Sequence, residues 1–82
     1  MRVNNNGDIY EADDTVGILM QMWDDNFHKD DFDKLEDYMK WMTEQVWIMF
    51  RVGLEIRGEF IEGKADNFIK DLADKEIIHI EE

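Results

Sequence analysis

The sequence predicts a small α+β domain whose elements follow the order β-β-α-α-β-α-β. Three observations carry this prediction: an Asn-Asn-Gly turn near the N-terminus, a helical apolar pattern over about residues 31–51, and a closing run rich in β-branched residues at 77–80. We expect a small, mostly antiparallel sheet packed against one long central helix. The 82 residues contain no proline and no linker-like stretch, so they fit a single compact domain, 1–82.

The start of the chain predicts a β-hairpin. Residues 2–4 and 8–11 flank the tripeptide Asn5-Asn6-Gly7. An Asn-Gly pair favours a tight hairpin turn because both residues accept positive φ angles.

A first helix over about 14–24 follows, because apolar side chains recur there at helical spacing. Asp13 or Asp14 offers a side-chain oxygen that can cap the first free amides of this helix. The polar residues 24–30 break the pattern and predict a loop, with Phe27 turned toward the core.

The longest predicted element is a helix over about 31–51. Its apolar side chains form two neighbouring stripes, so we expect the helix to run through the middle of the domain and to pack on two sides. Arg51 suits the negative end of the helix dipole, and Gly53 can supply the left-handed residue that ends the helix. The first stripe comprises Phe32, Leu35, Met39, Met42, Val46, Met49 and Phe50, and the second comprises Tyr38, Trp41, Gln45, Ile48 and Val52.

The last third of the chain predicts a strand, a helix and a strand. Residues 54–57 alternate between apolar and polar, as in a half-buried strand, and Phe60 and Ile61 are candidates to extend it. Apolar side chains between 65 and 73 recur at helical spacing and predict a short helix. The β-branched run at 77–80 predicts the closing strand.

Charge and composition exclude several classes of function. The chain has 21 acidic and nine basic side chains and a net charge of −12, so it would repel nucleic acid and anionic membrane surfaces. The absence of Cys excludes disulfides and thiolate zinc sites. The sequence has no run of 18 apolar residues and no signal-peptide pattern, so we expect a cytoplasmic protein, located in the host cytosol if a phage encodes it.

Candidate catalytic groups are few, because Ser and Cys are both absent. We interpret Thr15 as a helix-capping or solvent-exposed hydroxyl rather than a nucleophile. His28 lies in the acidic loop and His79 in the closing strand, and no pattern brings them together. The sequence therefore predicts a protein that is not an enzyme and that needs no cofactor.

The acidic residues that follow the first helix raise the possibility of a calcium site, but they do not match the EF-hand pattern. An EF-hand loop beginning at Asp24 requires Gly at its sixth position and Glu at its twelfth, where the chain has Lys29 and Leu35. A looser site at Asp31 and Asp33 is explained as well by helix capping. We predict no metal site.

Seven carboxylates crowd the stretch from 24 to 37, and Asp13 and Asp14 are their possible neighbours. A domain of this length is roughly 30 Å across, and roughly 18 duplex phosphates span that distance. The chain's 21 carboxylates approach this charge density, although solubility alone also explains an acidic surface. The hypothesis is that an acidic face occupies the basic nucleic-acid-binding groove of another protein. The carboxylates are Asp24, Asp25, Asp30, Asp31, Asp33, Glu36 and Asp37.

An alternative interpretation starts from the six Met and three Trp residues. Most of these side chains belong in the core, but a short chain has difficulty covering two apolar stripes on one helix. Met22, Trp41 or Trp47 would then remain exposed as a surface for a partner or for self-association. The chain would be an interaction module, such as an antitoxin, an adaptor or a homodimer.

In size, acidity, absence of Cys and the acidic run from Asp24 to Asp37, the chain resembles small phage and mobile-element anti-defence proteins, above all anti-CRISPR inhibitors. This resemblance covers the chain as a whole and assigns no residue by motif. It implies a DNA-mimic inhibitor whose partner is a CRISPR effector or another nuclease.

Overall fold

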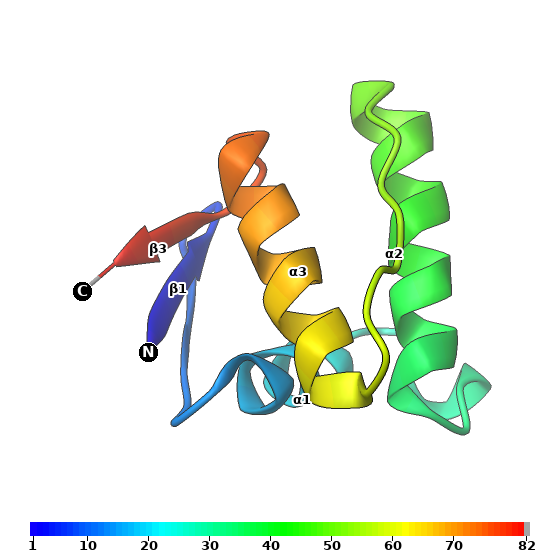
Figure 1. The fold of residues 1–82 in the computed structure, drawn as a ribbon, viewed down its shortest axis with the longest axis horizontal. Helices are drawn as coiled ribbons and strands as arrows, with labels where there is room; N and C mark the ends of the chain where they lie inside the picture. Colours follow the sequence, from blue (N-terminus) through cyan, green and yellow to red (C-terminus); the bar gives the residue numbers. More distant parts are fainter. Residues whose placement is uncertain (82) are drawn as a thin grey trace.

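The computed structural model describes residues 1–81 and contains a three-stranded antiparallel sheet and three α-helices (Figure 1). This arrangement confirms the predicted α+β class. The strands occur in the order β2-β1-β3, and a short 3-10 turn, Lys29–Asp31, precedes the second helix. The elements are β1 (Arg2–Asn5), β2 (Asp8–Glu11), α1 (Thr15–Asp24), α2 (Leu35–Phe50), α3 (Ile61–Asp74) and β3 (His79–Glu81).

The hairpin forms as the Asn-Gly pair predicts. Asn6 and Gly7 have φ angles of 54° and 99°, and β1 pairs with β2 directly on either side of them. The Asn4 side chain accepts a hydrogen bond from the Gly7 amide over 2.7 Å, which closes the turn. On its other edge β1 pairs with β3, so the fully buried Val3 lies in the central strand.

The first helix begins and ends close to its predicted bounds. Asp14 caps α1, since its side chain accepts a hydrogen bond from the Gly17 amide over 2.8 Å. The loop after α1 differs from the prediction at Phe27, which is 98% exposed rather than turned inward.

The central element is α3, not the long helix that the sequence indicated. Figure 1 shows α3 between the sheet and α2. Four of its side chains, at spacings of three and four residues, are almost completely buried: Ala65, Phe68, Ile69 and Leu72. The closing strand begins at His79 rather than Ile77, because the amides of Ile77 and Ile78 bond back to the Leu72 carbonyl.

The second helix is shorter than predicted and packs on fewer sides. It begins at Leu35 rather than near 31, since Phe32 has extended backbone. Its buried side chains are Leu35, Tyr38, Met39 and Val46, and residues 47–50 are exposed. The helix ends in a left-handed residue, but that residue is Arg51 with φ of 57° and not Gly53.

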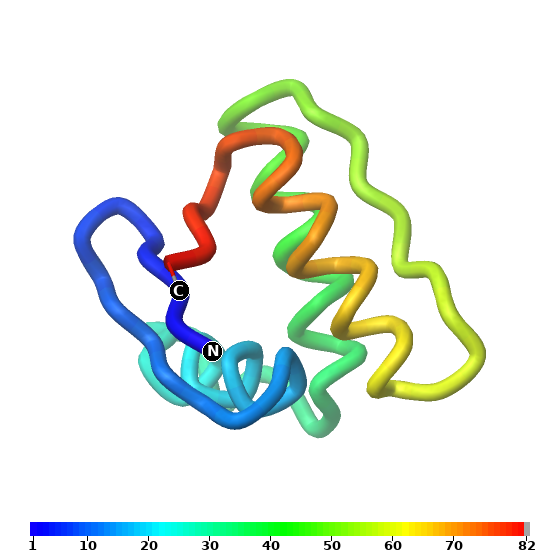
Figure 2. The backbone as a smooth tube through the Cα atoms, turned by 60° about the vertical axis from the view of Figure 1, so that its left-hand side comes forward, coloured from blue at the N-terminus to red at the C-terminus, as the bar shows by residue number. Residues whose placement is uncertain are grey.

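Residues 51–60 connect α2 to α3, and we call them the return segment. They contain the alternating pattern at 54–57 that predicts a strand. Both α2 and α3 run upward in Figure 1, and Figure 2 shows the return segment along the outside of the pair. Val52, Leu54 and Ile56 are half-buried between exposed neighbours. Among the described residues, however, 52–59 make no backbone–backbone hydrogen bond, so the predicted strand is wrong.

The return segment is extended because it must span the length of α2. Sixteen helical residues rise about 24 Å, which an extended chain of ten residues covers easily. Its end is fixed to α3 by a two-oxygen contact between Arg57 and Asp71, at 2.6 and 2.8 Å. Phe60 then precedes α3 and Ile61 begins it, so neither residue extends a strand.

The backbone of the turn that leads into α3 can be tested by replacing two glycines, Gly58 in the turn and Gly53 outside it. Gly58 has φ of 141°, and a Cβ atom there would lie 2.7 Å from the Lys64 amide nitrogen. We expect Gly58→Ala to lower the free energy of unfolding by about 1–3 kcal/mol. At Gly53 a Cβ atom would meet nothing within 4 Å, so Gly53→Ala should leave stability within about 1 kcal/mol of the wild type. Urea unfolding followed by tryptophan fluorescence measures both, and equal midpoints for the two variants would contradict this account of the turn.

Candidate functional site

Residues 24–37, the acidic segment, lie at the end of the molecule where α2 and α3 begin. The segment joins α1 to α2 and includes the first turn of α2, at the lower edge of Figure 1. Helix N-termini carry partial positive charge, which stabilises nearby carboxylates. Glu36 and Asp37 lie in the first turn of α2, and Glu62 lies in that of α3. The helix dipoles therefore favour negative charge at Glu36, Asp37 and Glu62, whereas Asp24 and Asp25 lie at the C-terminus of α1, where the dipole disfavours it.

The acidic segment exposes most of the carboxylates that the sequence indicated. Its first five carboxylates are exposed, whereas Glu36 and Asp37 are half-buried. Asp13 and Asp14 are also exposed, but they precede α1, whose ten residues span about 15 Å. The structure therefore places this pair at the opposite end of α1 from Asp24.

Cationic groups neutralise the acidic segment only in part. Asp24 lies 4.0 Å from Lys29 and Glu36 lies 3.3 Å from Lys64, while Asp31 lies 3.3 Å from the His28 imidazole, which is a cation only when protonated. Exposed pairs of this kind are weak, because water screens them. Within residues 1–81, four of the seven carboxylates have no ion pair: Asp25, Asp30, Asp33 and Asp37.

Aromatic side chains hold the acidic segment against α2. The Tyr38 ring lies between Trp23 and Trp41, with ring centroids 6.2 and 6.0 Å apart in near-parallel stacks. Phe32 meets Tyr38 edge-on at 5.7 Å. The Trp23 indole N–H donates to the Lys29 carbonyl over 2.9 Å. These contacts fix the part of the segment between α1 and α2, whose only regular structure is one short 3-10 turn.

A groove of about 370 Å³, the aromatic groove, separates the hairpin turn from α2. Its apolar lining comes from the end of α1 and one side of α2, and the hairpin turn and the end of α1 supply polar residues. The charged residues of the lining are Asp8 and Asp25, and no Lys, Arg or His residue contributes. Among the lining residues are Tyr10, Met22, Phe27, Tyr38, Trp41, Met42, Met49 and Phe50.

Asp25 connects this groove to the sheet. Its Oδ2 atom accepts a hydrogen bond from the Tyr10 hydroxyl over 2.8 Å, and its backbone caps the C-terminus of α1. Burial, reinforced by this hydrogen bond, raises the pKa of Tyr10 well above its usual range. Burial also raises the pKa of Tyr38 to about 12, although the Asn26 side chain opposes the shift.

The structure separates the three side chains proposed as an apolar partner surface. Met22 is 4% exposed, so its predicted exposure is wrong, and Trp41 is half-buried in the aromatic cluster. Trp47 is 52% exposed and lies under the Arg51 guanidinium, which is 5.9 Å from its ring centroid.

Three exposed side chains next to Trp47 were missed, because the two apolar stripes assigned them to the core. With Trp47 they make up the apolar patch, which surrounds the C-terminal end of α2. Trp47 and Ile48 lie beside the return segment, whereas Met49 and Phe50 line the aromatic groove. The exposed fractions of Trp47, Ile48, Met49 and Phe50 are 52%, 60%, 68% and 45%. The signal was present in the sequence, since four consecutive helical residues point in four directions and cannot share one buried face.

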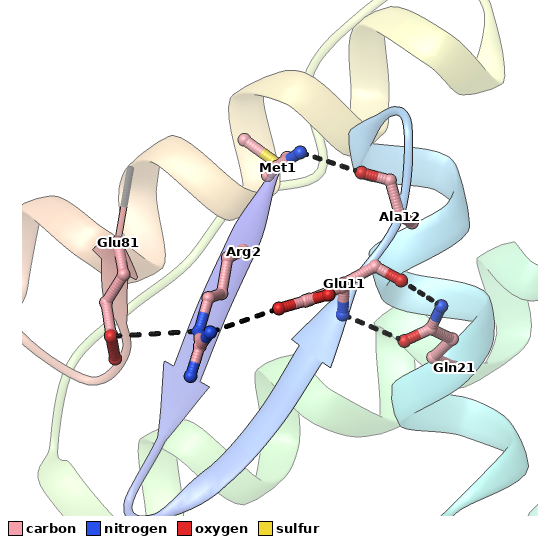
Figure 3. Close-up of polar contacts among 6 residues, drawn as sticks. All are labelled: Met1, Arg2, Glu11, Ala12, Gln21 and Glu81. Atoms are coloured by element: carbon pink, nitrogen blue, oxygen red, sulfur yellow. Dashed lines mark hydrogen bonds and ion pairs between the residues drawn. The ribbon is translucent and has the colours of Figure 1, made fainter.

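A second, wider depression of about 810 Å³ lies beside the N-terminus. In Figure 3, Arg2 reaches Glu11 at 3.2 Å and Glu81 at 3.9 Å, while the Met1 ammonium donates to the Ala12 carbonyl. The Gln21 side chain accepts from the Glu11 amide and donates to its carbonyl, so it covers the free edge of β2. These contacts join the sheet to α1 and have a structural role.

The hydroxyl and imidazole groups are dispersed. Thr15 is buried rather than capping or exposed, and its hydroxyl donates to the Asp66 carboxylate of α3. Thr43 donates to the Lys40 carbonyl within α2. Within residues 1–81, no three His, Asp or Glu side chains are grouped to hold a metal ion. None of the helices described is both long and apolar enough to cross a membrane.

Comparisons with protein families, curated proteins and solved structures gave no match for this chain.

The two buried tyrosines generate a prediction on pH. An unfolded tyrosine ionises near pH 10, whereas burial raises the pKa of Tyr38 to about 12 and also raises that of Tyr10. The folded state therefore retains protons that the unfolded state loses. The resulting stability is fully present below pH 10 and is lost as the pH rises toward 12, by about 1.4 kcal/mol per pH unit for each tyrosine.

Urea unfolding between pH 8 and pH 12 measures this loss of stability. Tyr10→Phe removes one of the two ionising groups, so its stability should fall less steeply above pH 10. Identical slopes for wild type and variant would contradict a raised pKa at Tyr10.

Proposed function

We propose that the protein is a non-enzymatic inhibitor that uses the acidic segment to occupy a basic, nucleic-acid-binding groove on another protein. The partner would be a nuclease or another nucleic-acid enzyme, most specifically a CRISPR effector, as the resemblance to anti-CRISPR inhibitors suggests. Binding would exclude DNA or guide RNA by direct competition.

The observation that carries this proposal is the cluster of exposed carboxylates at the α2 and α3 N-termini. Four of the seven lack an ion pair within the described residues, so their charge remains available to a partner. The domain measures 29 × 28 × 26 Å, a width over which a DNA duplex presents about one phosphate per 1.7 Å. A domain of this width, with carboxylates exposed at one end, can cover lysines and arginines that a short duplex would contact.

Electrostatic attraction also determines how such an inhibitor would bind. A net charge of −12 creates a long-range field that accelerates encounter with a basic surface. Exposed charge contacts are screened by salt, so a complex that survives washing at about 100 mM salt should dissociate at about 500 mM.

The test is a triple charge reversal, Asp30→Lys, Asp31→Lys and Asp33→Lys. These three side chains are exposed and lie outside the α-helices, so far-UV circular dichroism should not change. We expect the variant to lose inhibition of DNA binding by the captured nuclease, measured by electrophoretic mobility shift. The measurement begins with a pull-down that identifies a nuclease whose DNA binding the wild-type protein blocks.

The matched control is a triple reversal of exposed carboxylates elsewhere, Glu44→Lys, Glu55→Lys and Asp74→Lys. Both variants change the net charge from −12 to −6, so only the position of the charge differs. The control should still inhibit. If the folded acidic-segment variant inhibits as well as the wild type, or if both triple variants fail equally, the acidic segment is not the inhibitory surface.

The apolar patch favours a second candidate function, an interaction or self-association module. Trp47 and Ile48, each more than half exposed, border a shallow depression together with Leu54, and this side of the patch is suited to burial against another protein. In this case the affinity would come from the patch, and the acidic segment would contribute solubility.

This candidate predicts a different dependence on mutation and salt. Trp47→Ala should weaken partner capture or self-association about tenfold or more, because buried tryptophans often dominate an interface. Phe60→Ala, which removes another exposed aromatic ring outside the patch, should have little effect. Sedimentation velocity at about 100 and 500 mM salt measures self-association, and weakening at the higher salt would argue against an apolar interface.

A further inference from the structure

The aromatic groove combines an apolar floor with acceptors at its rim. Met49 and Phe50 contribute exposed apolar surface, the half-buried Met42 and Trp41 contribute part of theirs, and Phe27 is exposed beside them. The rim carries the carboxylates of Asp8 and Asp25 and the amide side chains of Asn5, Asn6 and Asn26. Neither a Lys, an Arg nor a His residue lines it, and within residues 1–81 neither carboxylate has an ion pair.

We propose that the aromatic groove receives an arginine side chain from the basic partner. The aliphatic stem of the arginine lies against the methionine and aromatic floor, and its guanidinium reaches Asp25 and Asp8. This inference rests on the proposed function in one respect, that the partner is a basic protein.

Charge complementarity indicates a cation. Asp25 bonds Tyr10 through Oδ2, which leaves Oδ1 available to another donor. Aromatic faces attract cations through their quadrupole, and this attraction strengthens where water is excluded. A carboxylate beside aromatic rings thus provides two favourable contacts for one cationic head group.

Geometry favours arginine over lysine. The guanidinium has five N–H donors in a plane, stacks on aromatic rings, and is less strongly hydrated than an ammonium group. The acceptors of the groove come from two separate segments, the hairpin turn and the end of α1, so they approach from different directions. A planar donor with several N–H groups can satisfy acceptors on both sides.

The volume of the groove indicates that its occupant is a side chain rather than a larger structural element. A volume of about 370 Å³ accommodates one or two long side chains but not a whole helix. A second copy of this chain is disfavoured as the source, because two molecules of net charge −12 repel each other.

The experiment titrates short blocked peptides into ¹⁵N-labelled protein and follows amide and indole resonances. The probe has one arginine in a glycine and alanine background, and matched peptides carry citrulline or lysine at the same position. Citrulline has nearly the same shape as arginine but no charge. We expect saturable shifts at the Trp41 indole N–H with the arginine peptide, and at least about tenfold weaker binding of the citrulline peptide, with lysine between them.

Two single-charge variants separate the groove from general attraction to an acidic protein. Asp25→Asn removes the groove carboxylate but keeps an oxygen for the Tyr10 hydroxyl, and it should weaken the arginine peptide about tenfold. Asp30→Asn makes the same change in net charge within the acidic segment but outside the groove, and it should change affinity less than about twofold.

Three results would overturn the inference. They are equal binding of the citrulline and arginine peptides, equal weakening by Asp25→Asn and Asp30→Asn, or shifts at the groove that depend on protein concentration without any peptide. The last result would identify a second copy as the occupant. Since the titration contains no nuclease, its failure leaves the proposed function standing if the triple charge reversal still abolishes inhibition. If the arginine peptide binds the groove but the variant with lysine at positions 30, 31 and 33 still inhibits the nuclease, the groove proposal stands and the proposed function is rejected.

Discussion

The α2 and α3 helices point in the same direction, and a chain can join two such helices only by running back along the length of one of them. The return segment spans about 24 Å in extended form and covers one side of α2 with Val52, Leu54 and Ile56. Because α3 lies between α2 and the sheet, it contributes Phe68, Ile69 and other buried side chains to the core. The return segment covers only one side of α2, and the C-terminal end of α2 extends beyond α3 in Figure 1, so residues 47–50 remain exposed.

The same constraint separates two kinds of surface. Parallel helices bring their N-termini to one end of the molecule, where partial positive charge favours the carboxylates at the start of α2, Glu36 and Asp37. The apolar patch lies at the other end of α2, about 24 Å away, and the Debye length at physiological salt is only about 8 Å. Charge in the acidic segment is therefore largely screened from Trp47 and Ile48, and mutations there should act independently of that segment. Met49 and Phe50 differ, because they line the same groove as Asp25.

Elements whose signals are local were predictable from the sequence. The hairpin depends on Asn6 and Gly7, and α1 depends on the cap at Asp14, so neighbouring residues suffice for both. The alternation at 54–57 predicts a strand in the return segment, but alternation shows only which side chains face apolar surroundings, not which backbone groups form hydrogen bonds. Likewise, the apolar stripes on α2 indicate which way each side chain points. Whether the side chains of residues 47–50 are buried depends instead on where α3 and the return segment pack.

The candidate sites also differ in whether local sequence or tertiary structure reveals them. The local sequence is enough to indicate the acidic segment, because its seven carboxylates lie close together in the chain, between 24 and 37. The aromatic groove had no such signal, since Tyr10, Asp25 and Trp41 come from a strand, a helix end and a second helix. Only the tertiary structure places these residues around one cavity.

Asp25 belongs to both the acidic segment and the aromatic groove, and this position gives the two surfaces different roles in binding. Exposed carboxylates act at long range, so they set the rate of encounter and its dependence on salt. A carboxylate beside aromatic rings acts at short range, where partial removal of water strengthens each contact. Among related complexes, affinity differs mostly through the rate of dissociation. The acidic segment would therefore attract many basic proteins, and selection among them would depend on which side chain a partner can place in the groove.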